Sequence, residues 1–119
     1  MSRVEKFRPC RTGYKTVRKQ RVGLYSPSCW NRCTLFPIGE WVETGPGWIQ
    51  ATYGGGYTAG FHVFHTKKAA QEWLDDFDEV LVRVQVKEPV ATGLDGVMGE
   101  ARVTVAKQIK ILEEVQVAT

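Results

Sequence analysis

Apolar and polar residues alternate strictly along the C-terminal third of the chain. From residue 80 to residue 86 every second residue is a valine, which predicts a strand with one buried face. Pro89 comes next and predicts the end of that strand, because proline cannot donate a ladder hydrogen bond. Asp95-Gly96, in a glycine-rich stretch, predicts a hairpin connection. A second alternating run over residues 101–112 then predicts an antiparallel partner strand.

A helical period precedes these strands. Residues 60–64 are typical of a short aromatic strand, and Thr66 is a suitable N-cap for a helix directly after it. A stripe of 3.6-residue period predicts a helix over about 66–77, formed by Ala69, Ala70, Trp73, Leu74 and Phe77. Lysines in its first turn and aspartates in its last turn oppose the helix dipole. The helix must therefore depend on burying its apolar stripe, and we predict that Trp73 lies in the core.

The N-terminal half carries shorter β-prone runs. They predict strands at residues 14–19, 22–25, 33–36, 38–43 and 48–53, with a flexible glycine loop at 54–56. We therefore predict an α+β fold: a single small domain of five to seven mostly antiparallel strands, packed on one helix. The strands would form a curled sheet or a partly open barrel. Trp41 is expected inside with Trp73, and Trp48, Tyr53 or Tyr57 partly outside.

Length and charge refine this picture. A chain of 119 residues is one domain by length, and we assign residues 13–119 to it and residues 1–12 to a flexible basic arm. The net charge of +3 is unevenly spread: residues 1–21 hold eight basic residues and one acidic residue, a balance of +7. The remaining residues hold eight basic and twelve acidic residues, a balance of −4. This asymmetry is typical either of a solvated arm or of a surface for an acidic partner.

Several classes of protein are disfavoured. No apolar run approaches the roughly 18 residues of a membrane span, and the charged N-terminus is not a secretory signal. The odd number of cysteines, 3, disfavours a closed disulfide framework, so free thiols in a cytoplasmic protein are expected. The glycine run at 54–56 has neither the Lys-Ser/Thr of a phosphate-binding loop nor the spacing of a dinucleotide fingerprint.

Metal and catalytic signals are weak. Two thiols and two imidazoles could in principle hold zinc: Cys29, Cys33, His62 and His65. However, His62 and His65 face opposite sides of a strand, so ordinary thiols and histidines remain the main interpretation. A cysteine nucleophile activated by His62 is the other option, again without local support. We assign no catalytic residue, no cofactor and no metal.

A partner-binding surface has more support. Exposed aromatic residues close to basic ones can anchor a protein interface or stack on bases. The predicted partner-binding residues are the basic residues of the N-terminal region and three aromatic residues of the middle third: Arg3, Lys6, Arg8, Arg11, Lys15, Arg18, Lys19, Arg21, Trp48, Tyr53 and Tyr57.

Two resemblances bear on function. Gly60-Phe61-His62-Val63-Phe64, with Thr66, Ala70 and Trp73, resembles the strand–helix block of small uncharacterised phage and prophage proteins. The segment at 105–112, Val-Ala-Lys-Gln-Ile-Lys-Ile-Leu, is similar to their closing strand. The resemblance implies a protein in the cytoplasm of an infected or lysogenic bacterium. Its partner would be a host protein or nucleoprotein, and its role could be to inhibit a host defence system such as CRISPR.

The same strand–helix block is also similar to that of small ADP-ribosyltransferases. This second resemblance implies an enzyme using NAD, with Arg18 on the nicotinamide side and Glu100 or Glu113 as the late catalytic glutamate. None of these three residues lies in a recognisable motif. We therefore expect a non-enzymatic binding protein, with the NAD-dependent transferase and a direct nucleic-acid-binding module as alternatives.

Overall fold

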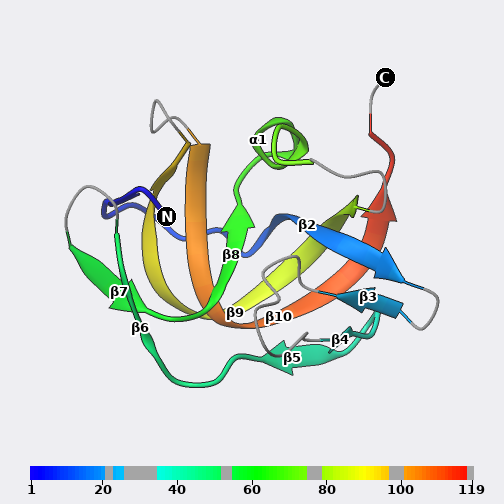
Figure 1. The fold of residues 1–119 in the computed structure, drawn as a ribbon, viewed down its shortest axis with the longest axis horizontal. Coiled ribbons are helices and arrows are strands. Elements are labelled where there is room, and N and C mark those ends of the chain that lie inside the picture. The colour runs from blue at the N-terminus through cyan, green and yellow to red at the C-terminus, as the bar shows by residue number, and fades with distance from the viewer. Residues whose placement is uncertain (21–22, 26–34, 52–54, 75–78, 97–100, 118–119) are drawn as a thin grey trace.

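The computed structural model describes the chain except for residues 21–22, 26–34, 52–54, 75–78, 97–100 and 118–119. The described residues form ten strands and one short helix (Figure 1). The elements are β1 (Arg3–Val4), β2 (Thr12–Gln20), β3 (Gly23–Tyr25), β4 (Leu35–Phe36), β5 (Trp41–Glu43), β6 (Trp48–Gln50), β7 (Gly56–Thr58), β8 (Phe61–Phe64), α1 (Lys67–Gln71), β9 (Glu79–Asp95) and β10 (Ala101–Val115). The predicted small domain of mostly antiparallel strands is confirmed, and the strands outnumber the five to seven expected.

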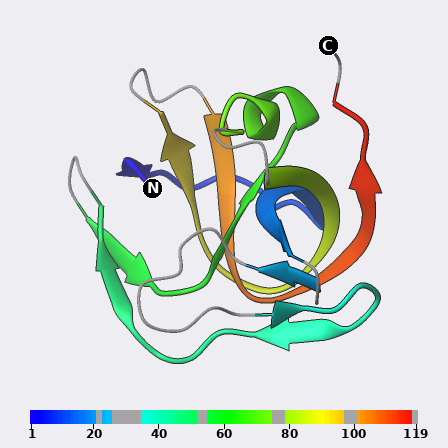
Figure 2. The same cartoon turned by 45° about the vertical axis from the view of Figure 1, so that its right-hand side comes forward.

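The long hairpin of β9 and β10 organises the sheet. The strand order is β1-β9-β10-β8-β2-β3-β4, with β5 also on β10, and β6 pairs with β7 as a separate ribbon. Figures 1 and 2 show that the hairpin is strongly curved and that β2 lies across it. Because β2 pairs with β9 as well as with β8, the sheet curls back on itself. Among the described residues only Tyr14 and Phe64 join β2 to β8, so the closure is partial and no regular barrel forms.

Pro89 does not end β9, contrary to the prediction. Pro89 is opposite Ala106 and Ala91 is opposite Val105, so Val90 is an extra residue in the ladder. This arrangement is a β-bulge, which is one of the few places where a sheet tolerates proline. The neighbouring Glu88 has a positive φ of 55°, which marks the same local distortion.

The helix is shorter than predicted. Thr66 is its N-cap as expected, because the Thr66 Oγ1 accepts a hydrogen bond of 3.2 Å from the Ala69 amide. The helix nevertheless ends at Gln71, so Trp73 lies beyond it and is 45% exposed, with its ring 5.8 Å from that of Phe64. The prediction that Trp73 fills the core is wrong. The helix buries one residue, Ala70, and residues 75–77 of the predicted helix lie outside the described part.

The core forms on both faces of the curved strands. The first cluster contains Val17, Phe36, Phe61, Val63, Val82, Val84, Ile109 and Ile111. The second contains Ala51, Tyr57, Phe64, Ala70, Leu81, Val103 and Val105. Residues that are adjacent in sequence, such as Val63 and Phe64, belong to different clusters because strand side chains alternate between faces. The strand at 80–86 is therefore buried on both faces over its central part, rather than on one.

Trp41 is also outside the core, contrary to the prediction. On β5 the neighbouring residue Val42 packs against the first cluster, so strand alternation turns Trp41 outwards. The residue is 38% exposed, and its ring centroid lies 5.4 Å from the ammonium of Lys87 and 5.0 Å from that of Lys110. The exposed indole is therefore held by cation–π contacts with these two lysines rather than by the core.

We expect that replacing Thr66 with alanine will destabilise α1 by about 1 kcal/mol, because the Ala69 amide then loses its side-chain acceptor. Hydrogen exchange at Ala69 and Ala70 should speed up, while exchange in β9 and β10 stays unchanged. Thr66→Ser should keep the protection, because the hydroxyl is retained. Equal exchange in the alanine variant and the parent protein would show that the cap does not stabilise this helix.

Candidate functional site

Residues 1–11, called the N-terminal segment below, lie along β9. The Ser2 amide donates to the Leu94 carbonyl at 3.1 Å, the Glu5 amide donates to the Thr92 carbonyl at 3.0 Å, and the Val86 amide donates to the Arg11 carbonyl at 2.8 Å. The sequence predicts a flexible arm here, whereas the structure shows a segment that is hydrogen-bonded at both of its ends. The apolar side chains of Val4 and Phe7 are partly buried, which favours docking over solvation.

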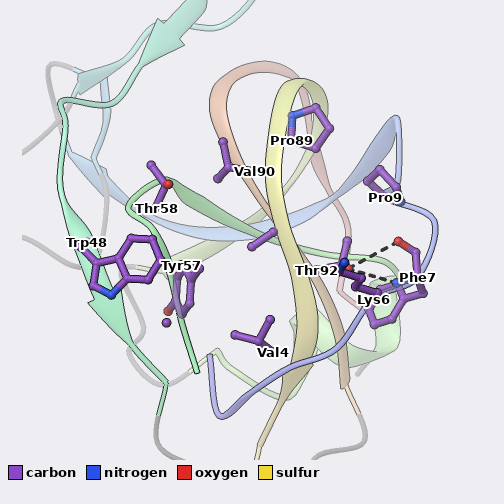
Figure 3. A pocket seen from close by; sticks show the side chains of 12 residues that line it. Val4, Lys6, Phe7, Pro9, Trp48, Tyr57, Thr58, Pro89, Val90 and Thr92 are labelled. Atoms are coloured by element: carbon purple, nitrogen blue, oxygen red, sulfur yellow. Dashed lines mark hydrogen bonds between the residues drawn. The ribbon is translucent and has the colours of Figure 1, made fainter. Parts of the chain in front are cut away.

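A groove of about 370 Å³ lies between this segment, the bulge of β9 and the β6–β7 ribbon. Figure 3 shows its three walls. The lining residues are Val4, Lys6, Phe7 and Pro9 from the N-terminal segment, Trp48, Gly56, Tyr57 and Thr58 from the ribbon, and Pro89, Val90, Ala91 and Thr92 from β9. The lining is mostly apolar, as is usual for ligand sites, and the volume is at the low end of their range of roughly 300–1,000 Å³.

Trp48 is the most exposed large apolar residue of the groove. Its indole lies against Gly56, where an added Cβ would overlap the ring, and 69% of the residue remains exposed. The glycine therefore lets the indole lie close to the backbone of β7. The bulge makes Val90 the second exposed apolar residue of the groove, at 39%. Of the residues expected partly outside, Trp48 is exposed, whereas Tyr57 is buried.

The predicted basic residues divide into two groups. Arg3, Lys6, Arg8 and Arg11 are exposed on the N-terminal segment, and Lys6 lines the groove. Three others belong to β2: Lys15 is buried, Arg18 is half-buried and Lys19 forms an ion pair with Glu114. Arg21 lies outside the described residues. The described members of this second group do not line the groove. The first group gives the N-terminal segment, which forms one wall of the groove, its positive charge.

Tyr57 and His62 form a buried polar pair beneath the groove. The Tyr57 hydroxyl lies 2.9 Å from the His62 Nε2 and accepts a hydrogen bond of 2.9 Å from the N-terminal amine of Met1. Burial, with added repulsion from the nearby positive charge of Lys15, lowers the pKa of His62 to about 4. Burial also raises the pKa of Tyr57. Both side chains are therefore neutral near pH 7, and their contact is a structural hydrogen bond.

A second polar contact lies on the other side of β8. The His65 Nε2 lies 2.6 Å from the Thr104 Oγ1, and the Cys10 amide donates to the same hydroxyl at 3.1 Å. His62 and His65 have different partners, as expected from strand alternation. Burial raises the pKa of the Cys10 thiol, so this cysteine is not an activated nucleophile.

The other candidates that the structure describes do not converge on a reaction centre. Cys29 and Cys33 lie outside the described residues, as does Glu100. In the described part of the chain no three histidine, cysteine, aspartate or glutamate residues could share a metal ion. Glu113 is exposed and forms an ion pair of 3.1 Å with Arg83. Tyr53, predicted as a partner-binding residue, also falls outside the described part.

Sequence reasoning misses most of the groove, because only Lys6, Trp48 and Tyr57 among its lining residues are predicted site residues. Phe7, Pro9, Pro89 and Val90 are not among the predicted site residues, because each has an ordinary interpretation as part of an arm or as a strand end. The usable signal is Pro89 inside a long alternating run. A proline that does not end a strand marks a bulge, and bulges redirect side chains.

Comparison with known protein families, with curated proteins and with solved structures finds no match to this chain. Within the described residues, α1 is far too short to cross a bilayer and no other helix is formed.

Proposed function

We propose that this chain is a non-enzymatic binding protein that engages a partner protein through the groove between the N-terminal segment, β9 and the β6–β7 ribbon. The observation that carries the proposal is the 69% exposure of Trp48 at the edge of an apolar groove. Exposed tryptophans beside apolar pockets are typical of residues that supply much of the affinity at protein interfaces. The resemblance to small phage proteins supports a host protein or nucleoprotein as the partner, and inhibition of a host defence system as the outcome.

Charge at the rim would add speed and selectivity. Arg3, Lys6, Arg8 and Arg11 accompany a single acidic residue, Glu5, along the N-terminal segment. Such a surface attracts a negatively charged partner and raises the association rate more than the final affinity. The apolar groove would then supply the slow dissociation.

We expect that replacing Trp48 with alanine will weaken partner binding at least about tenfold, because an interface anchor of this type contributes more than 1 kcal/mol. The parent protein, Trp48→Ala and Ile38→Ala would each be immobilised and incubated with bacterial lysate at moderate salt. Ile38 is the matched control, because it is 59% exposed and does not line the groove.

The expected result is a protein retained by the parent chain and by Ile38→Ala, but lost from Trp48→Ala. The affinity for that protein, once purified, should fall in the same order. Equal retention by Trp48→Ala, or no specific protein retained by the parent chain, would contradict the proposal. Retained nucleic acid whose binding falls steeply with salt would indicate the nucleic-acid alternative instead.

A further inference from the structure

We infer that the groove binds an extended acidic peptide of the partner through one large apolar side chain, and that the peptide does not join the sheet as an added strand. This inference rests on the proposed function and specifies its ligand. It is based on the backbone of β9, on the groove lining and on the charge at the rim.

The edge of β9 is left unpaired where the groove lies. Hydrogen bonds between the N-terminal segment and β9 stop at Val86 and resume at Thr92. Between these points the segment crosses towards β10, where the Cys10 amide bonds to the Thr104 Oγ1. Among the described residues, the stretch of β9 at 87–91 therefore has its ladder partner, β10, on one side only.

An unpaired edge of a β-sheet can usually bind an additional strand through backbone hydrogen bonds. Here Pro89 has no amide to donate, and the bulge at Val90 breaks the register of the edge. Both features oppose strand addition. Recognition must therefore come from side chains rather than from a ladder of backbone hydrogen bonds.

The groove lining fits one large apolar anchor. Val90 on β9 and Trp48 on the β6–β7 ribbon are the exposed apolar residues of the groove, with Tyr57 beside Trp48 and Val4 on the N-terminal segment (Figure 3). Their surfaces are apolar, and Tyr57 directs its hydroxyl to His62 and to the N-terminal amine. An aromatic or long aliphatic side chain would gain by the burial of apolar area, and the Tyr57 hydroxyl beneath it would keep its hydrogen bonds.

The charge at the rim selects acidic neighbours for that anchor. Lys6 lines the groove, and Arg3 and Arg8 adjoin the lining residues Val4, Phe7 and Pro9. Glu5 and Glu88 are the acidic residues next to the lining in the sequence, and Glu88 accepts a 2.8 Å hydrogen bond from Gln108. Asp95 lies near Tyr57, on the side of the groove away from Lys6, where its charge helps to raise the pKa of the tyrosine. Positive charge is thus in excess on the N-terminal wall, so acidic residues on either side of the anchor would be favoured.

The test is selection from a random 12-residue peptide library displayed on phage. The targets are the parent protein, Trp48→Ala, and the double variant Lys6→Glu with Arg8→Glu, whose two residues are exposed. The parent should enrich peptides with one large apolar residue flanked by aspartate or glutamate. Trp48→Ala should lose them, and the charge-reversed variant should lose the acidic preference.

The strongest peptide would then be synthesised for affinity measurements. Replacing its anchor with alanine should weaken binding at least about tenfold. Methylating single backbone amides should change the affinity by less than about threefold, because no ladder is formed.

Each other result overturns the inference. Enriched peptides without acidic residues, or enrichment that survives in Trp48→Ala, would reject the ligand class or the site. A tenfold loss on alternate amide methylation would show strand addition. If no peptide is enriched while the lysate experiment still yields a partner lost from Trp48→Ala, the peptide inference fails and the proposed function stands. If no partner is retained either, both fail.

Discussion

Replacing Lys15 with methionine is expected to stabilise the protein by about 2 kcal/mol at pH 7. Lys15 is only 8% exposed, and its ammonium donates a hydrogen bond of 3.1 Å to the His62 carbonyl. It also lies 6.0 Å from the centroid of the Phe61 ring. This cation–π contact compensates only weakly for the hydration that the ammonium loses on burial. The charged lysine is therefore buried at a cost that methionine, an apolar residue of similar length, avoids.

The lowered pKa of Lys15 sets the size of the expected gain in stability. Burial lowers the pKa of Lys15 from 10.5 to about 8, and this difference corresponds to roughly 3 kcal/mol. Losing the hydrogen bond to the His62 carbonyl offsets about 1 kcal/mol of that gain. The net stabilisation at neutral pH is therefore about 2 kcal/mol.

The sign of the pH dependence is set by the same pKa. Between about pH 8 and pH 10.5 the folded protein has lost the Lys15 proton while the unfolded chain still holds it. The unfolded state then binds more protons, so this group increases stability as the pH rises. The advantage of Lys15→Met over the parent protein should therefore be constant below pH 8 and shrink between pH 8 and pH 10.5.

Urea unfolding of both proteins at pH 7, 8.5 and 10 measures this difference directly. Lys68→Met is the matched control, because Lys68 is exposed and its replacement should change stability by less than about 0.5 kcal/mol. A less stable Lys15→Met protein, or a difference independent of pH, would show that Lys15 is not buried as a charged group.

The second large effect is expected at Gly13, where β2 crosses β8. A Cβ at this position would lie 2.5 Å from the Val63 Cγ1 and 2.6 Å from the Phe64 carbonyl oxygen. Because the second contact is with backbone, the two strands must separate to accommodate a methyl group. Gly13→Ala should therefore destabilise the protein by about 2–3 kcal/mol, in the range of overpacked core positions.

Gly45→Ala provides the control for this prediction. No atom lies within 4 Å of a Cβ at Gly45, so the substitution should be neutral or slightly stabilising through the unfolded state. The urea midpoints of the two variants should differ clearly while their m-values remain equal. Equal midpoints would mean that β2 and β8 do not approach as closely as described.

The burial of Lys15 also affects the proposed site. Its charge lowers the pKa of His62, which bonds to Tyr57 at the base of the groove. The sequence predicts Lys15 as a partner-binding residue, but its place in the interior rules out direct contact with a partner. Any change in binding caused by Lys15→Met would therefore be indirect, through the interior contacts of Lys15 with β8.

The groove itself could be predicted only in part. Trp48 and the basic residues Arg3, Lys6, Arg8 and Arg11 are identifiable from residue type and charge alone. Pro89 and Val90 cannot be identified in this way, because a bulge depends on the register of two paired strands. The sequence of one strand alone does not determine that register. The predictions for Trp41 and Trp73 are wrong for a related reason. The hydrophobic pattern shows that each segment has apolar residues, but it does not show which of them is buried in the core.

The sequence by itself determined the local elements: the strand at 61–64, the Thr66 cap, the alternating run of β9 and its antiparallel partner β10. Each depends on residues close together in the chain, where period and capping chemistry act directly. Only the tertiary structure decided the length of α1, the burial of Lys15, the docking of residues 3–11 on β9 and the existence of the groove. These features join segments up to about ninety residues apart, and contacts over that separation are fixed by packing and strand register rather than by local pattern.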